Sequence, residues 1–394
     1  MLDLTRSLRR AGRVATGVDR VERAYLRCLI GQVEPVFGLV RTAYGYLLLD
    51  RDGMQRFHGA LSGASGWGAR DLLSRLPRGR SPEVQIAEAS LRRWAIARAR
   101  PGRLGAMLRD HLPAGTLYFN VGHSNLTDRV LSTVRDLPDA RIAIFVHDVI
   151  PLEFPQFQRQ GTVAPFRDKL RRAFAHADML IYNSRDTHER AERAMAAEAR
   201  IPPGVVAHLG VDPVTPDATR LPPELPPARP YFIAIGTIEP RKNIGFLLDV
   251  WQDLGADAPP LLICGARGWN NRAVFDRLDA LPVNGSVREL GVMSDGAVAA
   301  VLQGASALVF PSLAEGFGLP PVEAARLQIP VLCNDLPVLR EVLGDNAVYA
   351  PVTDRYLWAT KVKSMAAKPP FAPQMPRFQP TTWQDHFKIV LRLR

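Results

Sequence analysis

Cysteine is scarce in this sequence. Its 394 residues include three cysteines, Cys28, Cys264 and Cys333, which lie far apart and among apolar neighbours. No CxxC pair or Cys/His cluster occurs, so neither a disulfide framework nor a cysteine-bound metal is expected. This pattern favours a reducing, cytoplasmic setting.

Long apolar runs are also missing. No stretch of eighteen or more apolar residues occurs, so no transmembrane helix is predicted. The N-terminal "MLDLTRSLRRAG" is basic but lacks the apolar segment of a signal peptide. The composition, 47% hydrophobic and 23% charged, is that of a globular protein, and 394 residues exceed one ordinary core. We therefore expect two domains.

Acidic residues are fewer than basic ones, 39 Asp and Glu against 50 Lys and Arg, and the formal net charge is +11. Many cations lie in the first half, at Arg6, Arg9, Arg10, Arg13, Arg20, Arg23, Arg27, Arg167, Lys169, Arg171 and Arg172. Basic helices of this kind dock on anionic membrane surfaces, but they also serve as solubilising faces, and the sequence favours neither reading. Nucleic acid is the least favoured partner, because no binding module or aromatic-basic stripe occurs.

Short apolar segments alternate with helical patterns along most of the chain. Strands are predicted in the first half at "TLYFNVGH", "RIAIFVHD", "MLIYNS" and "VVAHLGVD", and two more within "PVFGLVRTAYGYLLLD". In the second half they are predicted at "PYFIAIG", "LLICGA", "VRELGVM", "ALVFPS", "PVLCND" and "AVYAPV". The alternation indicates βαβ units and parallel sheets, and hence an α/β protein with two Rossmann-like, doubly wound domains.

A proline-rich stretch divides the chain. "PDATRLPPELPPARP", at 216–230, is predicted to be a stiff, exposed linker between domains at 1–215 and 231–370. An amphipathic helix is expected at 380–394, and 53–100 is interpreted as a helical insertion. The "DRD" at 50–52 is interpreted as a turn. Ligands of such sheets bind beyond the carboxyl ends of the strands.

One strand-end loop, "VFPSLAEGFGLPPVE" at 309–323, leads from a predicted strand into a helix. Pro320 or Pro321 fits the first turn of that helix, where a missing N–H costs nothing. Backbone N–H groups would then point outward from the helix N-terminus, forming an anion site. The residues that would offer them are Gly316, Phe317, Gly318 and Leu319.

Two glutamates flank this loop. Glu315 lies on the strand side and Glu323 about one turn into the helix, so they could address different parts of one ligand. Taken singly, Glu323 could merely complement the helix dipole and Glu315 could be a solvated loop residue. The whole constellation favours a functional site.

A second strand-end loop, "GTIEPRKN", places Arg241 and Lys242 before a helix. Two cations at a helix N-terminus are unfavourable unless an anion binds there, and a diphosphate would suit both. Alternatively Glu239 pairs with Arg241 to stiffen the loop, and both readings can hold. Asn243 is expected to cap the helix.

Histidines follow two other strands. His147 could hydrogen-bond a sugar hydroxyl or act as an acid or base. Equally, it could be a structural histidine held by Asp148. His123 is interpreted as structural or acceptor-side, and the N–H of Gly17, just before a helix, could face a phosphate. No DxD pair stands at a strand end, so no metal site is predicted.

These motifs resemble those of the retaining, family-4 glycosyltransferases with the GT-B fold. The spacing in "EGFGLPPVE" is similar to their E-x7-E motif, and "GTIEPRKN" is similar to their phosphate-binding loop. "TGVDRVERAYL", "NVGHSNL" and "FVHDVIP" resemble the acceptor domain of a bacterial polysaccharide-biosynthesis branch, and "LGVD" its domain crossing. The terminal "TTWQDHF" helix resembles one that crosses back to complete the first domain.

The resemblance implies a role for each motif residue. Glu315 would contact the donor sugar, and Glu323 the ribose of the nucleotide. Arg241 and Lys242 would stabilise the departing diphosphate, in place of a metal. His147 would lie near the reaction centre.

It also implies backbone contacts to the donor from Gly316, Phe317, Gly318 and, on the acceptor side, Gly17. Thr237 stands where many relatives carry an arginine, so fewer cations would hold the diphosphate.

The resemblance implies a metal-independent, cofactor-free hexosyltransferase. It would move mannose from GDP-mannose to a hydroxyl of a lipid-linked glycan, as a cytoplasmic enzyme or a peripheral one on the inner face of the plasma membrane. The alternatives are a nucleotide-sugar epimerase, a glycan phosphorylase, or a non-catalytic basic scaffold on a membrane.

Overall fold

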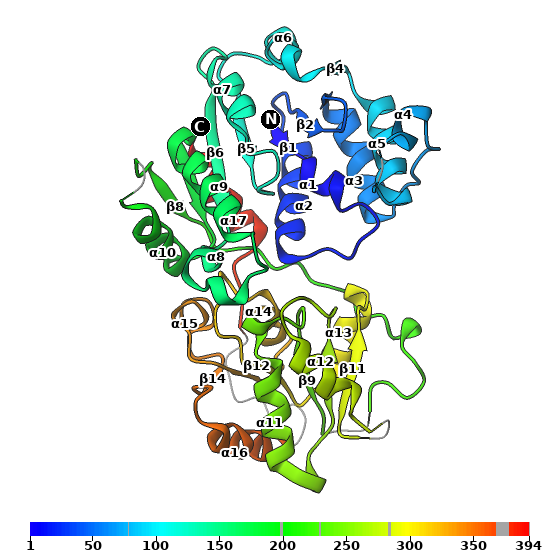
Figure 1. Ribbon diagram of the computed structural model, residues 1–394, viewed down its shortest axis with the longest axis vertical. Coiled ribbons are helices and arrows are strands. Elements are labelled where there is room, and N and C mark those ends of the chain that lie inside the picture. Colours follow the sequence, from blue (N-terminus) through cyan, green and yellow to red (C-terminus); the bar gives the residue numbers. More distant parts are fainter. Residues whose placement is uncertain (78, 198–199, 228–229, 283–284, 368–377, 394) are drawn as a thin grey trace.

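The computed structural model describes the chain except for residues 78, 198–199, 228–229, 283–284, 368–377 and 394. Its strands form an eight-stranded sheet, ordered β4-β3-β2-β1-β5-β6-β7-β8, and a six-stranded sheet, ordered β11-β10-β9-β12-β13-β14. Each sheet belongs to its own layered α/β unit, and Figure 1 shows the two units meeting end to end. The predicted α/β architecture is confirmed.

The first sheet is mixed. Its strands are β1 (Leu2–Asp3), β2 (Gly38–Arg41), β3 (Tyr46–Leu49), β4 (Ala97–Ala99), β5 (Leu117–Asn120), β6 (Arg141–Val146), β7 (Met179–Tyr182) and β8 (Gly204–Val206). From β2 through β1 to β8 the neighbours are parallel, but β2–β3 and β3–β4 are antiparallel. The expectation of parallel pairing fails at this edge because β2 and β3 form a hairpin, closed by a bond from the Thr42 N–H to the Gly45 carbonyl.

Helices cover both faces of this sheet (Figure 1). They are α1 (Thr5–Arg9), α2 (Gly17–Ile30), α3 (Arg51–Ser62), α4 (Leu72–Arg75), α5 (Pro82–Trp94), α6 (Leu104–His111), α7 (Asp128–Arg135), α8 (Ile150–Glu153), α9 (Val163–His176) and α10 (Arg185–Met195). The segment 53–100 is largely helical as expected, although it also contributes β4. The turn expected at 50–52 is wrong: Asp50 caps α3 by accepting the N–H of Gly53.

The second sheet is parallel throughout. Its strands are β9 (Phe232–Ile235), β10 (Leu261–Cys264), β11 (Val287–Gly291), β12 (Ala307–Phe310), β13 (Val331–Cys333) and β14 (Val348–Tyr349). Its helices are α11 (Ile244–Leu254), α12 (Arg272–Asp279), α13 (Asp295–Gly304), α14 (Leu319–Arg326), α15 (Pro337–Leu343) and α16 (Arg355–Ala366). All four residues of β12 are buried, as in a parallel strand covered on both faces.

The last helix, α17 (Trp383–Val390), packs on the first domain. The His386 ring is buried there, with Nε2 2.9 Å from the Tyr25 hydroxyl and Nδ1 3.0 Å from the His208 carbonyl oxygen. The Phe387 ring meets the Tyr25 ring edge-on at 4.9 Å. No helix in the described ranges is long and apolar enough to cross a membrane.

Candidate active site

Two strand-end loops of the second domain come together. β9 and β12 are neighbours in the sheet, so the loops that follow them share one edge. The Lys242 side chain folds back over Gly236, where a Cβ would be 3.2 Å from the lysine Cε. Lys242 Nζ then lies 4.6 Å from the centre of the Phe310 ring, at the end of β12. The predicted loops therefore form one site.

Glu315 joins the two loops through ion pairs. Its Oε1 lies 2.6 Å from Lys242 Nζ, and its Oε2 lies 2.8 Å from Arg241 Nη1. Arg241 also pairs with Glu239, whose Oε1 is 2.8 Å from Nη2. The alternative reading of Arg241, as a partner of Glu239, is thus confirmed alongside its place beside Glu315.

Burial and charge oppose each other in this cluster. Burial raises the pKa of Glu315, but Arg241 and Lys242 outweigh it and bring the pKa to about 2. Burial lowers the pKa of Lys242, although Glu315 favours its charged form. For Arg241, the carboxylates outweigh burial and raise its pKa. The site therefore holds two cations between two carboxylates: Glu315 pairs with both cations, and Glu239 pairs with Arg241 alone.

The loop after Glu315 opens α14 as expected. Pro320 and Pro321 lie in its first turn, and Gly318 precedes it with a left-handed φ of +89°. Within the described part of the chain, the N–H groups of Gly316, Phe317 and Gly318 have no hydrogen-bond acceptor. These donors are free for a ligand at the positive end of the α14 dipole.

Gly316 is also a contact between the domains. A Cβ there would stand 2.2 Å from the His147 carbonyl oxygen, so only glycine permits this approach. The Gly316 carbonyl accepts hydrogen bonds from the hydroxyls of Ser184, at 3.0 Å, and Thr187, at 3.1 Å. Sequence reasoning assigned this glycine to ligand contact alone and missed its role in domain contact.

The His147 ring is buried behind the same contact. Its Nε2 lies 2.6 Å from the Val121 carbonyl, and burial lowers the pKa to about 4, so the ring is neutral. Because a carbonyl only accepts, Nε2 carries the proton and Nδ1 is left as an acceptor. Asp148 does not hold this ring, contrary to one expectation; its carboxylate accepts the N–H of Ile150 instead.

Gly17 lies across the domain boundary from Leu319. It is the first residue of α2, and a Cβ there would be 3.4 Å from the Leu319 side chain. The N-termini of α2 and α14 therefore face the same space, one from each domain. Two positive helix ends at one point suit a polyanionic ligand such as a diphosphate.

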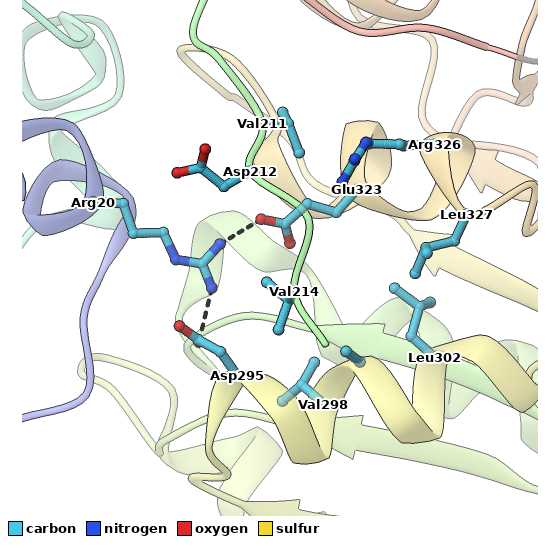
Figure 2. Close-up of a pocket in the computed structure, with 11 residues that line it drawn as sticks. Arg20, Val211, Asp212, Val214, Asp295, Val298, Leu302, Glu323, Arg326 and Leu327 are labelled. Atoms are coloured by element: carbon cyan, nitrogen blue, oxygen red, sulfur yellow. Dashed lines mark hydrogen bonds and ion pairs between the residues drawn. The ribbon is translucent and has the colours of Figure 1, made fainter. Parts of the chain in front are cut away.

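Glu323 is held by a residue that sequence reasoning left unassigned. Arg20 of α2 pairs with Glu323 and, through Nη2 at 2.8 Å, with Asp295 of α13 (Figure 2). These three side chains border a pocket lined further by Val211, Asp212, Val214, Val298, Ala299, Leu302, Arg326 and Leu327. Burial raises the pKa of Glu323, although Arg20 favours its charged form. The sequence did carry a signal for this role of Arg20. A cation in the first turn of α2 opposes the helix dipole, just as Arg241 does in the loop before α11.

Two loop residues differ from expectation. Asn243 precedes α11 in a left-handed conformation, φ +54°, and its side chain makes no capping hydrogen bond. Its role is therefore to turn the backbone, which asparagine tolerates better than most residues. The Thr237 side chain packs toward Gly268, where a Cβ would be 2.8 Å from its Cγ2. Thr237 thus lies in the loop after β9 but faces a neighbouring loop.

Glu341 of α15 makes a further contact between the domains that sequence reasoning missed. Its carboxylate accepts the N–H groups of Arg185, at 2.7 Å, and Asp186, at 3.0 Å, at the start of α10. It also lies 2.7 Å from His208 Nε2. A carboxylate from one domain therefore caps a helix of the other.

Two Rossmann-like domains with a site between them define a GT-B enzyme fold. Residues 217–375 match the family model of the group 1 glycosyl transferases.

Curated relatives agree with this assignment. The chain is 34% identical over 221 residues to the serotype-specific mannosyltransferase WbdA of Escherichia coli, covering 52% of this chain and 27% of WbdA. It is 37% identical over 127 residues to O-antigen chain mannosyltransferase B of Escherichia coli, covering 32% of this chain and 33% of the relative. The chain thus matches about a quarter to a third of the length of these relatives.

Solved structures share the fold. Anabaena HepE, solved with UDP and glucose, aligns with a TM-score of 0.54 at 17% identity, over 67% of this chain and 71% of that one. OtsA, solved in its apo form, aligns with a TM-score of 0.51 at 12% identity, over 74% of each chain. At these identities the likeness concerns the fold alone.

Proposed function

We propose that the protein is a retaining glycosyltransferase that moves mannose from GDP-mannose to a hydroxyl of a glycan acceptor. One observation carries the proposal: Glu315 is held by Arg241 and Lys242 at the edge where α2 and α14 point their N-termini. The assignment of mannose is supported by the similarity to WbdA and O-antigen chain mannosyltransferase B.

Arg241 and Lys242 would bind the diphosphate of the donor. Positive charge builds on the sugar ring as its bond to the diphosphate breaks, while negative charge builds on the leaving group. Fixed cations stabilise that leaving group where it forms, as a metal does elsewhere. We therefore propose that the reaction needs no metal ion.

The carboxylates would exchange partners when the donor binds. Glu315 would turn from the two cations toward hydroxyls of the sugar, and Glu323 would leave Arg20 for the ribose. The neutral His147 would accept a hydrogen bond from the sugar at Nδ1, because Nε2 is engaged by Val121.

The acceptor is proposed to be a lipid-linked glycan in cell-surface polysaccharide biosynthesis, reached at the inner face of the plasma membrane. This part of the proposal is supported by the O-antigen description of a relative. The net charge of +11 is compatible with an anionic membrane surface.

A ligand screen followed by a turnover assay tests the function. GDP should raise the melting temperature more than UDP or ADP, because a ligand that binds only the native state stabilises it. GDP-mannose with acceptor and EDTA should then release GDP and give an α-linked product. Conversion of GDP-mannose without acceptor would instead identify an epimerase. Failure of every nucleotide to bind would overturn the enzyme assignment and favour a scaffold.

A further inference from the structure

The loop at 121–126 in the first domain lies between two arginines on different helices. Arg6 of α1 packs on Gly122, where a Cβ would be 2.9 Å from the Arg6 Cβ. On the other side, Arg172 of α9 donates to the Leu126 carbonyl at 3.0 Å. Both arginines therefore contact the same loop, one from each side.

Helical spacing brings two more cations to the same place. Lys169 precedes Arg172 by three residues on α9, and Arg9 follows Arg6 by three residues on α1. Residues three apart on a helix share a face. Lys169 is partly buried, and its pKa is lowered by burial and by the nearby charges of Arg6, Arg172 and Arg9. Lys169 therefore lies among three arginines, two of which contact the loop.

Two carboxylates lie near Arg6, Asp19 and the buried Glu22. Glu22 Oε2 lies against Gly122, and burial raises the pKa of Glu22 to about 8. Asp19 pairs with Arg6 at 2.7 Å, but it also pairs with Arg10 at 2.5 Å. Within the described parts of the chain, neither Lys169 nor Arg9 pairs with a carboxylate. The ammonium of Lys169 lies 6.0 Å from the centre of the Phe166 ring. Lys169 therefore lies among like charges with no carboxylate partner in the described chain, which disfavours the fold unless an anion joins it.

This cluster is continuous with the candidate active site. Arg6 Nη2 donates to Thr16 Oγ1 at 3.2 Å, and Thr16 directly precedes Gly17. On the same loop, the His123 ring lies 5.2 Å from the His147 ring. The cations therefore extend from the proposed donor site into the first domain, on the side where an acceptor would lie.

We propose that Arg6, Arg9, Lys169 and Arg172 form a subsite for a phosphate group carried by the acceptor. This inference rests on the proposed function, since it places a charged acceptor beside the donor. Lysine and arginine both bind phosphate oxygens, and a partly buried site strengthens those contacts. The phosphate could belong to a lipid carrier or to a soluble sugar phosphate, and the chemistry of recognition is the same.

Binding can be measured with the donor site filled. Calorimetry in saturating GDP would titrate geranyl phosphate, a lipid phosphate, and mannose 6-phosphate, a soluble one. Lys169→Met should weaken at least one of them by about tenfold or more, the loss of one charge-assisted contact. Arg9→Gln, at an exposed position, should weaken the same probe. Arg171→Met is the matched control, because Arg171 is exposed on α9 and pairs with Asp168.

The two probes separate the sources of the phosphate. Preference for geranyl phosphate supports a lipid-linked acceptor, and preference for mannose 6-phosphate supports a soluble one. The subsite would be overturned if Lys169→Met and Arg9→Gln bound both probes as tightly as wild type. It would also be overturned if wild type bound neither probe. Binding that appears only with phosphatidylglycerol vesicles and is insensitive to both substitutions would overturn it as well. GDP affinity, measured in separate titrations without either probe, reports on the proposed function independently.

Discussion

Arg20 and Glu323 form an ion pair between the two domains, with Asp295 as a second acceptor for the same guanidinium. Glu323 is the carboxylate proposed to bind the ribose of the donor. That carboxylate is therefore already occupied by a side chain from the opposite domain. Donor binding has to exchange one partner for the other.

Replacing Arg20 tests this exchange. Arg20→Met should bind GDP as tightly as wild type or more tightly, because Glu323 no longer has to leave a cation. Glu323→Ala should weaken GDP binding by about tenfold or more, since hydrogen bonds to a charged group contribute about 1.5–3 kcal/mol. Both affinities can be measured by calorimetry.

Arg27→Met is the control for Arg20. Arg27 also lies on α2 and pairs with Asp212 at 2.8 Å, but both side chains are half exposed. It should leave GDP affinity unchanged. If Arg20→Met bound GDP much more weakly than this control, Arg20 would itself contact the nucleotide.

Lys242 should matter more for turnover than for binding. Lys242→Met removes a cation from the proposed leaving group, so kcat should fall by about 10²–10³-fold, as when one donor to a developing anion is lost. Arg241 remains, so GDP affinity should fall much less. Steady-state kinetics with GDP-mannose would measure both, with the exposed Lys363→Met as control. Full turnover in Lys242→Met would exclude the leaving-group role.

Much of the second domain could be predicted from its sequence. Strands such as "FIAI", "LLIC" and "ALVF" are continuous apolar runs, because a parallel strand is buried on both faces. The loops after these strands carry charged residues that a simple connecting turn does not need. Three of them, Glu315, Arg241 and Lys242, meet in the structure. Local pattern and strand order were enough to bring these three together.

The contacts between domains could not be predicted. Arg20 and Glu323 are 303 positions apart, and nothing in either segment specifies how the two domains approach. From the sequence, Glu341 is indistinguishable from an ordinary surface residue. The structure places its carboxylate at the start of α10. In the first domain, β1 has only two residues, too few for any periodic signal, although it lies at the centre of the sheet.

Glu315 should make stability depend on pH in the acid range. Its folded pKa, about 2, lies below the ordinary 4.5, so the folded state favours the carboxylate. The resulting stabilisation is complete above about pH 4.5 and is lost as the pH falls toward 2. The difference in unfolding free energy between wild type and Glu315→Gln should therefore be largest near neutral pH and shrink below pH 4.5. Urea denaturation at several pH values would measure it, and a constant difference across that range would contradict the ion-pair explanation.

Gly316 should be needed for domain contact rather than for nucleotide affinity. In Gly316→Ala the added methyl would meet the His147 carbonyl, so the domains could not approach as closely. Turnover should fall by about tenfold or more, because a misplacement of about 1 Å costs up to 10²-fold in rate. GDP affinity should stay close to that of wild type, since the second domain supplies Glu323, Arg241 and Lys242. Small-angle scattering should show a larger radius of gyration. Gly66→Ala is the control, because a Cβ there meets nothing within 4 Å. Wild-type turnover and an unchanged radius of gyration in Gly316→Ala would mean that the His147–Gly316 contact is not required for catalysis.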